Sequence, residues 1–268
     1  MNDKLTRARS ELRDMEALAA QSSPVHSLHP LAKLLVTILY IVTVVSFPKY
    51  DLSALIVMVL YPAFLYQLAG ISVGLCFHRQ RYVLPLVCAV GLVNPFLDRE
   101  PIMRLGSLLV SGGFVSMLTL MLKGVFALMA SFLLIATTSI DSLCAALRRL
   151  HVPSLITTLL LLTYRYVGVM LEEASVMADA YKLRAPGQNG IRFNAWGSFI
   201  GQLLLRSMDR AEELYGSMQL RGFRGEFYYA DVRPFRAADA LFTVGVSAAV
   251  LCARYFDIAA LVGGLFVR

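Results

Sequence analysis

Residues 114–138, with the sequence FVSMLTLMLKGVFALMASFLLIATT, form the centre of an apolar run that extends over 106–139. A hydrocarbon core of about 30 Å is crossed by about 20 helical residues, because each residue adds about 1.5 Å. The whole run is therefore too long for a single crossing, and Gly112-Gly113 offers a break within it. The sequence predicts a tilted transmembrane helix over 114–138 and an interfacial segment over 106–113.

Four further apolar runs have a length near that of a transmembrane helix. They cover residues 31–47, 52–69, 82–97 and 237–253. The chain of 268 residues is 57% hydrophobic and 16% charged, whereas soluble domains are about 45–50% apolar and about 25% charged. We therefore predict an all-α polytopic membrane protein with about five transmembrane helices in a lipid bilayer, and not an ordinary soluble enzyme.

The distribution of lysine and arginine predicts the orientation of these helices, because cytoplasmic loops carry an excess of both. The N-terminal tail holds four, the loop 70–81 holds two and the block 140–236 holds twelve. We expect these segments on the cytoplasmic side of a multi-pass protein of the cell (inner) membrane. Since such loops account for the net charge of +7, we expect no nucleic-acid partner.

The predicted organisation has three parts. Residues 1–139 form the N-terminal tail and transmembrane helices 1–4, residues 140–235 form cytoplasmic or interfacial coupling helices, and residues 236–268 form a C-terminal transmembrane helix and tail. An alternative makes 155–171 another crossing, but that run contains Arg165, and an arginine at a helix centre costs about 2.5–3.5 kcal/mol. We favour a cytoplasmic or membrane-surface helix there, with the exact number of crossings and the side of the C-terminus left open.

The block 140–225 is predicted to contain three helices. We expect them over 142–150, 153–184 and 196–221, the first capped by Asp141 and the second opened by Pro153. Helix-breaking residues follow closely after both long helices, so their ends are well marked in the sequence.

The two long helices end in matched sequences. Residues 172–185 read EEASVMADAYKLRA and residues 209–222 read DRAEELYGSMQLRG, an offset of 37. Both end in leucine, arginine and a small residue. On each helix, largely apolar residues with 4-3-4-3 spacing lie along one face and lead to the arginine, and we call each such row a seam. The candidate docking ends are Leu183, Arg184 and Ala185 on the first helix and Leu220, Arg221 and Gly222 on the second. The seam residues are Met170, Ala174, Met177 and Tyr181 on the first helix and Ser207, Ala211, Leu214 and Met218 on the second.

These terminal arginines have two interpretations. The helix dipole favours basic residues at helix C-termini, which explains either arginine taken alone. A guanidinium group can also fork onto carboxylates or carbonyls in a partner's pocket. Two similar helix ends fit two similar pockets, and two similar pockets predict a dimeric partner.

Sequence motifs for nucleotide binding and catalysis are missing. The chain contains no G-x-x-x-x-G-K-[ST], no H-E-x-x-H and no G-x-S-x-G. We therefore expect no catalytic residue, no metal site and no cofactor in this chain, and we predict that it is not an enzyme. His26 and His29 are interpreted as interfacial polar residues, Glu172-Glu173 as solvated or ion-paired side chains, and Asn94-Pro95 as a kink with a locally satisfied amide.

Several motifs resemble those of the transmembrane T components of energy-coupling-factor (ECF) transporters. They are Ser27-Leu28-His29-Pro30-Leu31-Ala32-Lys33-Leu34-Leu35, Thr137-Thr138-Ser139, Leu150-His151-Val152-Pro153, Tyr164-Arg165-Tyr166 followed by Leu171-Glu172-Glu173, and the two Leu-Arg endings. The ending Leu183-Arg184-Ala185 departs from the family's more usual small-Arg-Gly form. The opening segments 15–19 and 24–26 resemble the CbiQ-like, cobalt-linked branch of the family.

The resemblance implies a scaffold subunit of an ECF-type ABC importer. Such a subunit joins two cytoplasmic ABC ATPase subunits, which bind the ATP, to a separate membrane substrate-binding (S) subunit, here CbiM/CbiN-like. Arg184 and Arg221 would seat in grooves of the two ATPases. Cobalt is the favoured substrate, then nickel, then a vitamin, and whether the ATPases are identical is left open. Rival hypotheses are a membrane enzyme that uses Glu172, Glu173 and Arg165, and an ordinary ABC permease that pairs with a second copy.

Overall fold

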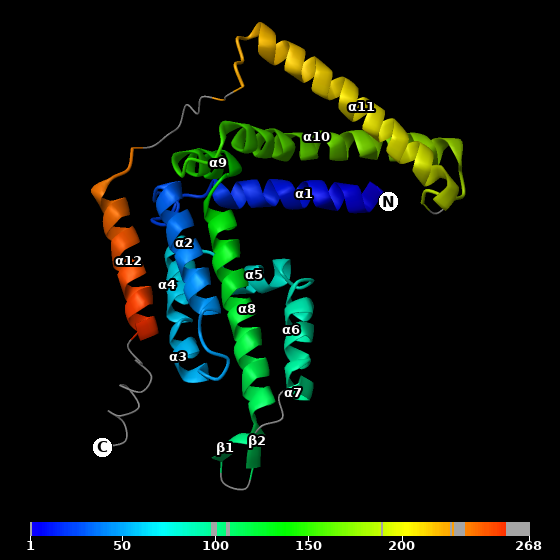
Figure 1. The fold of residues 1–268 in the computed structure, drawn as a ribbon. Helices are drawn as coiled ribbons and strands as arrows, with labels where there is room; N and C mark the ends of the chain where they lie inside the picture. Colours follow the sequence, from blue (N-terminus) through cyan, green and yellow to red (C-terminus); the bar gives the residue numbers. More distant parts are fainter. Residues whose placement is uncertain are drawn as a thin grey trace. The chain divides into compact units, whose positions relative to one another are not determined.

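The computed structural model describes residues 2–97, 101–105, 108–188, 190–225, 227 and 234–255. The described chain is helical apart from one short hairpin, and it divides into two compact units (Figure 1). We call Met1–Ala19 with Ser139–Val232 the hairpin unit and Ala20–Thr138 with Arg233–Arg268 the apolar unit. The prediction of a helical, polytopic membrane protein is confirmed.

The apolar unit is built around one long helix, α8. Its elements are α2 (Pro30–Val45), α3 (Leu52–Val57), α4 (Leu60–Ala69), α5 (Val73–Arg79), α6 (Leu84–Leu92), α7 (Asn94–Leu97), β1 (Pro101–Leu105), β2 (Leu108–Ser111), α8 (Gly112–Thr137) and α12 (Ala237–Tyr255). Helices α2, α3, α4, α6 and α7 all pack on α8, and α12 packs on α2 and α3. Strands β1 and β2 form an antiparallel hairpin just before α8.

The buried core of this unit lies where α2 and α8 meet. Tyr40 and Leu55 are fully buried and pack with Phe126 and Ala130 of α8 and Val250 of α12. The Tyr40 hydroxyl donates a hydrogen bond to the Met58 carbonyl (2.9 Å). A buried hydroxyl without such an acceptor would be costly, so this bond lets an apolar core keep a tyrosine.

Three described helices are long and apolar enough to cross a membrane: α8, α12 and α10 (Ser154–Arg184) of the hairpin unit. A fourth crossing results if residues 54–69 and α5, bent by 105° at their junction, count as one broken span. Helix α2 is apolar but has only 16 residues. All five segments predicted as transmembrane helices are thus helical over most of their described length, although they differ in length and continuity.

The predicted helix over 82–97 is interrupted: the chain divides into α6 and α7 at Val93, beside the kink predicted at Asn94-Pro95. Pro95 lacks a backbone N–H and so cannot continue the hydrogen-bond pattern of α6, which explains the break. The Asn94 amide is satisfied, as expected, but its partner is the Ser116 hydroxyl of α8 (3.0 Å) and not a local group. The segment predicted as interfacial also differs: residues 108–111 form β2, and α8 starts at Gly112, while 106–107 lie outside the described residues.

The hairpin unit consists of α1 (Asn2–Ala19), α9 (Ile140–Arg149), α10 and α11 (Phe193–Leu220). Helices α1 and α9 both pack on α10 (Figure 1). The predicted cap of α9 is wrong: the Ser139 hydroxyl, not Asp141, accepts the backbone N–H of Ser142. The Asp141 carboxylate instead pairs with Arg165 (2.9 Å) and so connects α9 to α10.

Candidate functional site: an antiparallel helical hairpin with a basic residue at each end

The two long helices form a hairpin whose arms run in opposite directions. Residues 185–192 connect α10 to α11, and the 28 residues of α11 extend about 42 Å at 1.5 Å per residue. Arg184 is the last residue of α10, while Arg221 follows the far end of α11. The two arginines therefore lie at opposite ends of the hairpin, about 40 Å apart along its axis.

Each end of the hairpin is shaped by residues that cannot continue a helix. Gly222 takes a positive φ of 81°, and the backbone N–H of Phe223 donates to the Met218 carbonyl (2.9 Å). This is the geometry of a glycine-terminated helix, which non-glycine residues adopt at a cost. Helix α10 ends at Arg184, just before the Pro186-Gly187 pair, where Gly187 has a φ of 91°.

The side chains at both ends are accessible. Leu183 is 84% exposed and Leu220 is 92% exposed, and both arginines are exposed as well. Neither guanidinium forms an ion pair or hydrogen bond with another residue in the part of the chain that the structure describes. Each end therefore presents a leucine and a cation side by side, a combination that can fill an apolar pocket and bind its acidic or carbonyl rim.

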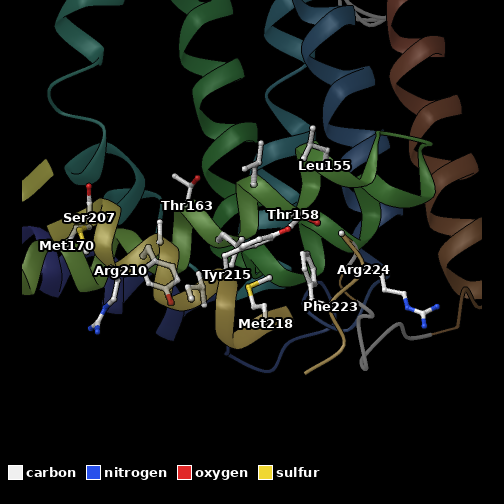
Figure 2. Close-up of a pocket in the computed structure, with 16 residues that line it drawn as sticks. Leu155, Thr158, Thr163, Met170, Ser207, Arg210, Tyr215, Met218, Phe223 and Arg224 are labelled. Atoms are coloured by element: carbon white, nitrogen blue, oxygen red, sulfur yellow. The ribbon is translucent and has the colours of Figure 1, made fainter. Parts of the chain in front are cut away.

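The seam residues do not share one environment. Met170 and all four predicted seam residues of α11 line one groove between α10 and α11 (Figure 2), with a volume of about 770 Å³. Leucines of α10 and Phe223 make this groove largely apolar, and Arg210 and Arg224 also line it.

The rest of the α10 seam lies outside the groove. Ala174 is buried, and Tyr181 serves the connection between the helices: its hydroxyl donates to the Gln188 side chain (3.1 Å) and accepts the backbone N–H of Arg192 (3.4 Å). The two seams are thus similar in sequence and different in their surroundings.

The two glutamates considered for acid–base chemistry are ion-paired, as we expected. Glu172 pairs with Arg9 of α1 (2.9 Å), and Glu173 pairs with Arg206 of α11. Neither partner was predicted from the sequence. The amphipathic, charge-rich helix over 2–19 was the available signal, but which helix it would contact depends on tertiary structure.

The described residues contain no group of three or more His, Cys, Asp or Glu side chains that could hold a metal ion. His26 pairs through Nδ1 with the Ser23 hydroxyl (2.7 Å). His29 is buried at the start of α2, where its Nδ1 accepts the backbone N–H of Leu31 (3.1 Å) and caps the helix. Both histidines therefore have local structural partners.

Comparison with known proteins places the chain in a family. The family described as "Cobalt transport protein", CbiQ, matches residues 21–229. Similar proteins include the cobalt transport protein CbiQ of Rhodobacter capsulatus, 36% identical over 104 residues (38% of this chain and 42% of the relative), and the nickel permease LarQ of Lactiplantibacillus plantarum, 31% identical over 91 residues (34% and 33%). The cobalt transport protein CbiQ of Salmonella typhimurium is 27% identical over 143 residues (49% and 63%).

These three matches span between a third and just under two thirds of each relative's length. The family match is broader, since it covers both long helices of the hairpin and all the apolar helices except α12. Together with the membrane-length apolar helices, it shows that this chain is a membrane protein of the CbiQ cobalt transport protein family.

Proposed function

We propose that this chain is the transmembrane scaffold (T) component of an ECF-type ABC importer. In this role it couples ATP hydrolysis by two cytoplasmic ATPase subunits to a separate substrate-binding (S) subunit in the membrane. The observation that carries the proposal is the pair of exposed Leu-Arg ends, at residues 183–184 and 220–221, at opposite ends of one hairpin. The ATP belongs to the partner subunits, and no cofactor is assigned to this chain.

The spacing of the two ends supports two docking sites. A separation of about 40 Å is too large for both arginines to enter one small pocket, and it suits two neighbouring globular subunits. Nucleotide-driven movement of these subunits would move the two ends of the hairpin relative to each other. Coupling requires a partner with two conformational states that contact the hairpin differently.

The groove between α10 and α11 is the proposed contact surface for the membrane subunit. Its lining is mostly apolar, and Leu155 and Leu159 at its wall are 66% and 55% exposed. Apolar surface of this extent favours a partner or lipid that covers it. We assign it to an apolar segment of the S subunit, for which a CbiM/CbiN-like protein is our candidate.

Cobalt is the proposed substrate, and nickel is the second candidate. The family description and two of the relatives' names refer to cobalt, and one relative is named a nickel permease. The substrate would be bound by the S subunit. We further propose a multi-pass arrangement in the cell (inner) membrane with the hairpin unit in the cytoplasm, because the lysine and arginine content is highest there. Helix α10 is apolar enough to cross a membrane, but we assign it to the cytoplasmic side because it carries the charged Arg165, paired with Asp141.

The test is a double charge reversal, Arg184→Glu with Arg221→Glu, in the chain co-expressed with its ATPases. We expect loss of ATPase co-purification and of metal uptake, with membrane insertion unchanged. The matched control is Arg7→Glu with Arg13→Glu, which changes the net charge equally at exposed positions of α1. If the Arg184/Arg221 variant retains its ATPases at the normal yield, the docking assignment is wrong.

The stoichiometry of the intact complex separates this function from the two rivals. One copy of this chain per two ATPases is expected for a scaffold, whereas two copies are expected for an ordinary permease. A membrane enzyme would instead show catalytic activity as the purified chain alone. Native mass spectrometry of the detergent-solubilised assembly measures the ratio directly.

A further inference from the structure

The chain passes between the two units in three places. It does so between Ala19 and Ala20, between Thr138 and Ser139, and again ahead of α12. The helix ends of the apolar unit that lie next to these passages are the start of α2, the end of α8 and the start of α12. The covalent connections between the two units therefore lead into the apolar unit at these ends.

A buried lysine connects the first two of these ends. Lys33, on the first turn of α2, is only 6% exposed, and its Nζ donates a 2.6 Å hydrogen bond to the Thr137 carbonyl on the last turn of α8. The carbonyls of a final helical turn lack intrahelical partners and carry partial negative charge. A lysine that is buried at this point therefore satisfies an acceptor and stabilises the helix end at once.

A buried aspartate connects the first and third ends. Asp239, on α12, is 5% exposed. Its Oδ1 accepts the backbone N–H of His29, just before α2 (2.8 Å), and its Oδ2 accepts the backbone N–H of Arg236, just before α12 (2.8 Å). Both carboxylate oxygens are thus used, one for its own helix and one for a helix more than 200 positions away in the sequence.

We propose that Lys33, Thr137, His29 and Asp239 form a polar anchor that fixes the ends of α2, α8 and α12 to one another. These are positioning residues: three separately mobile ends would absorb a movement of the hairpin unit, whereas fixed ends pass it to the apolar unit as a whole. Hydrogen bonds to charged groups are stronger in a buried setting, which suits this task. The sequence motifs 27–35 and 137–139 meet in the anchor, although the proposed ATPase docking uses neither.

The chain offers a matched control at the opposite end of α2. Lys123, on α8, donates to the carbonyls of Val45 and Phe47, at the C-terminal end of α2. Lys33 and Lys123 thus make the same kind of bond between the same two helices, but only Lys33 does so at helix ends from which the chain continues to the hairpin unit. Lys33→Met and Lys123→Met remove the same chemical group at these two places.

The first measurement is amide hydrogen exchange of the chain in lipid nanodiscs. We expect Lys33→Met to speed exchange over 133–138 by about ten-fold or more, because a hydrogen bond from a charged group is lost there. Lys123→Met should leave 133–138 unchanged, and Lys33→Arg, which keeps a donor, should restore much of the protection. Unchanged exchange at 133–138 in Lys33→Met would overturn the anchor. If Lys33→Met fails to fold, amide exchange over 27–31 is measured in Asp239→Asn, which retains one acceptor oxygen. We expect faster exchange there, and unchanged exchange would overturn the anchor.

The second measurement, which rests on the proposed function, is metal uptake per ATP hydrolysed in the reconstituted complex. We expect Lys33→Met to retain its ATPases and their hydrolysis rate and to lose at least half of the uptake per ATP, while Lys123→Met retains it. Equal uptake per ATP in Lys33→Met and the unmodified complex would overturn the positioning role. If the unmodified chain binds no ATPases, the proposed function fails, and the exchange measurement still decides whether the anchor exists.

Discussion

Arg206 of α11 pairs with Glu173 of α10, and this ion pair joins the two arms of the hairpin. The Arg206 side chain is 51% exposed and that of Glu173 is 31% exposed. Partly exposed pairs contribute about 0–1 kcal/mol, since water and salt screen them. The pair therefore orients the arms relative to each other more than it stabilises the fold.

Replacing Glu173 with glutamine should leave transport intact. We expect the unfolding temperature of Glu173→Gln to fall by less than about 4 °C and metal uptake to remain within about two-fold of the unmodified protein. Glu212→Gln, at an exposed position of α11, serves as the control. Loss of metal uptake in Glu173→Gln at unchanged stability would contradict this prediction and show that the Glu173 carboxylate has a role beyond the ion pair.

The contact of α6 with α8 should depend on Gly124. A Cβ atom at this position would overlap the Val87 side chain, so Gly124→Ala forces the two helices apart, at a cost of about 1–3 kcal/mol. Thermal unfolding in detergent is the measurement. Val87→Ala in the same protein should restore most of the loss, and Gly168→Ala on α10, where a Cβ meets nothing within 4 Å, should be neutral or stabilising.

The thiol of Cys144 should be unreactive at neutral pH. Cys144 is buried in α9, and burial, assisted by the Asp141 carboxylate, raises its pKa to about 11. Since the thiolate is the reactive form, about one thiol in a thousand is reactive at pH 8. In a variant that retains only Cys144, maleimide labelling should be slow and should accelerate about ten-fold for each pH unit up to about pH 10. Rapid labelling at pH 7 would show that α9 does not pack as described.

Filling the groove should disrupt binding of the proposed S subunit and leave binding of the ATPases intact. Ala211 lies on the α11 side of the groove, and Ala211→Trp would occupy much of the space beside it. We expect this variant to retain its ATPases, because both Leu-Arg ends are unchanged, and to lose the membrane subunit in co-purification. Glu212→Trp, one residue along the same helix and not among the groove residues, should retain both partners.

The sequence predicted the positions of most helices well. The apolar runs located α2, α8 and α12, and the proline and glycine residues after 184 and 221 located the ends of the long helices. The break between α6 and α7 lies beside the kink predicted at Asn94-Pro95, because Pro95 lacks the backbone N–H that would continue the helix. The cap of α9 was assigned two residues too late, since both Ser139 and Asp141 are good capping residues.

The geometry of the candidate site was harder to predict. Aligning 172–185 with 209–222 shows that the two helix ends match in sequence but not where they lie. The short connection 185–192 makes the two helices antiparallel and so puts the two arginines at opposite ends of the hairpin. The alignment also suggested two equivalent seams, but the two helices have different neighbours, since α1 and α9 pack on α10. Contacts between residues far apart in the sequence, such as those of Lys33 and Asp239, have no local signal.

The most direct test of the account is site-specific photo-cross-linking at the two ends of the hairpin. A photoreactive residue is introduced in place of Leu183 or of Leu220, which are both highly exposed, in the complex purified from native membranes. The account predicts that each position cross-links to an ATPase subunit, and that a double-labelled chain captures two of them. Cross-links to lipid alone at either position, with the ATPases still bound, would contradict it.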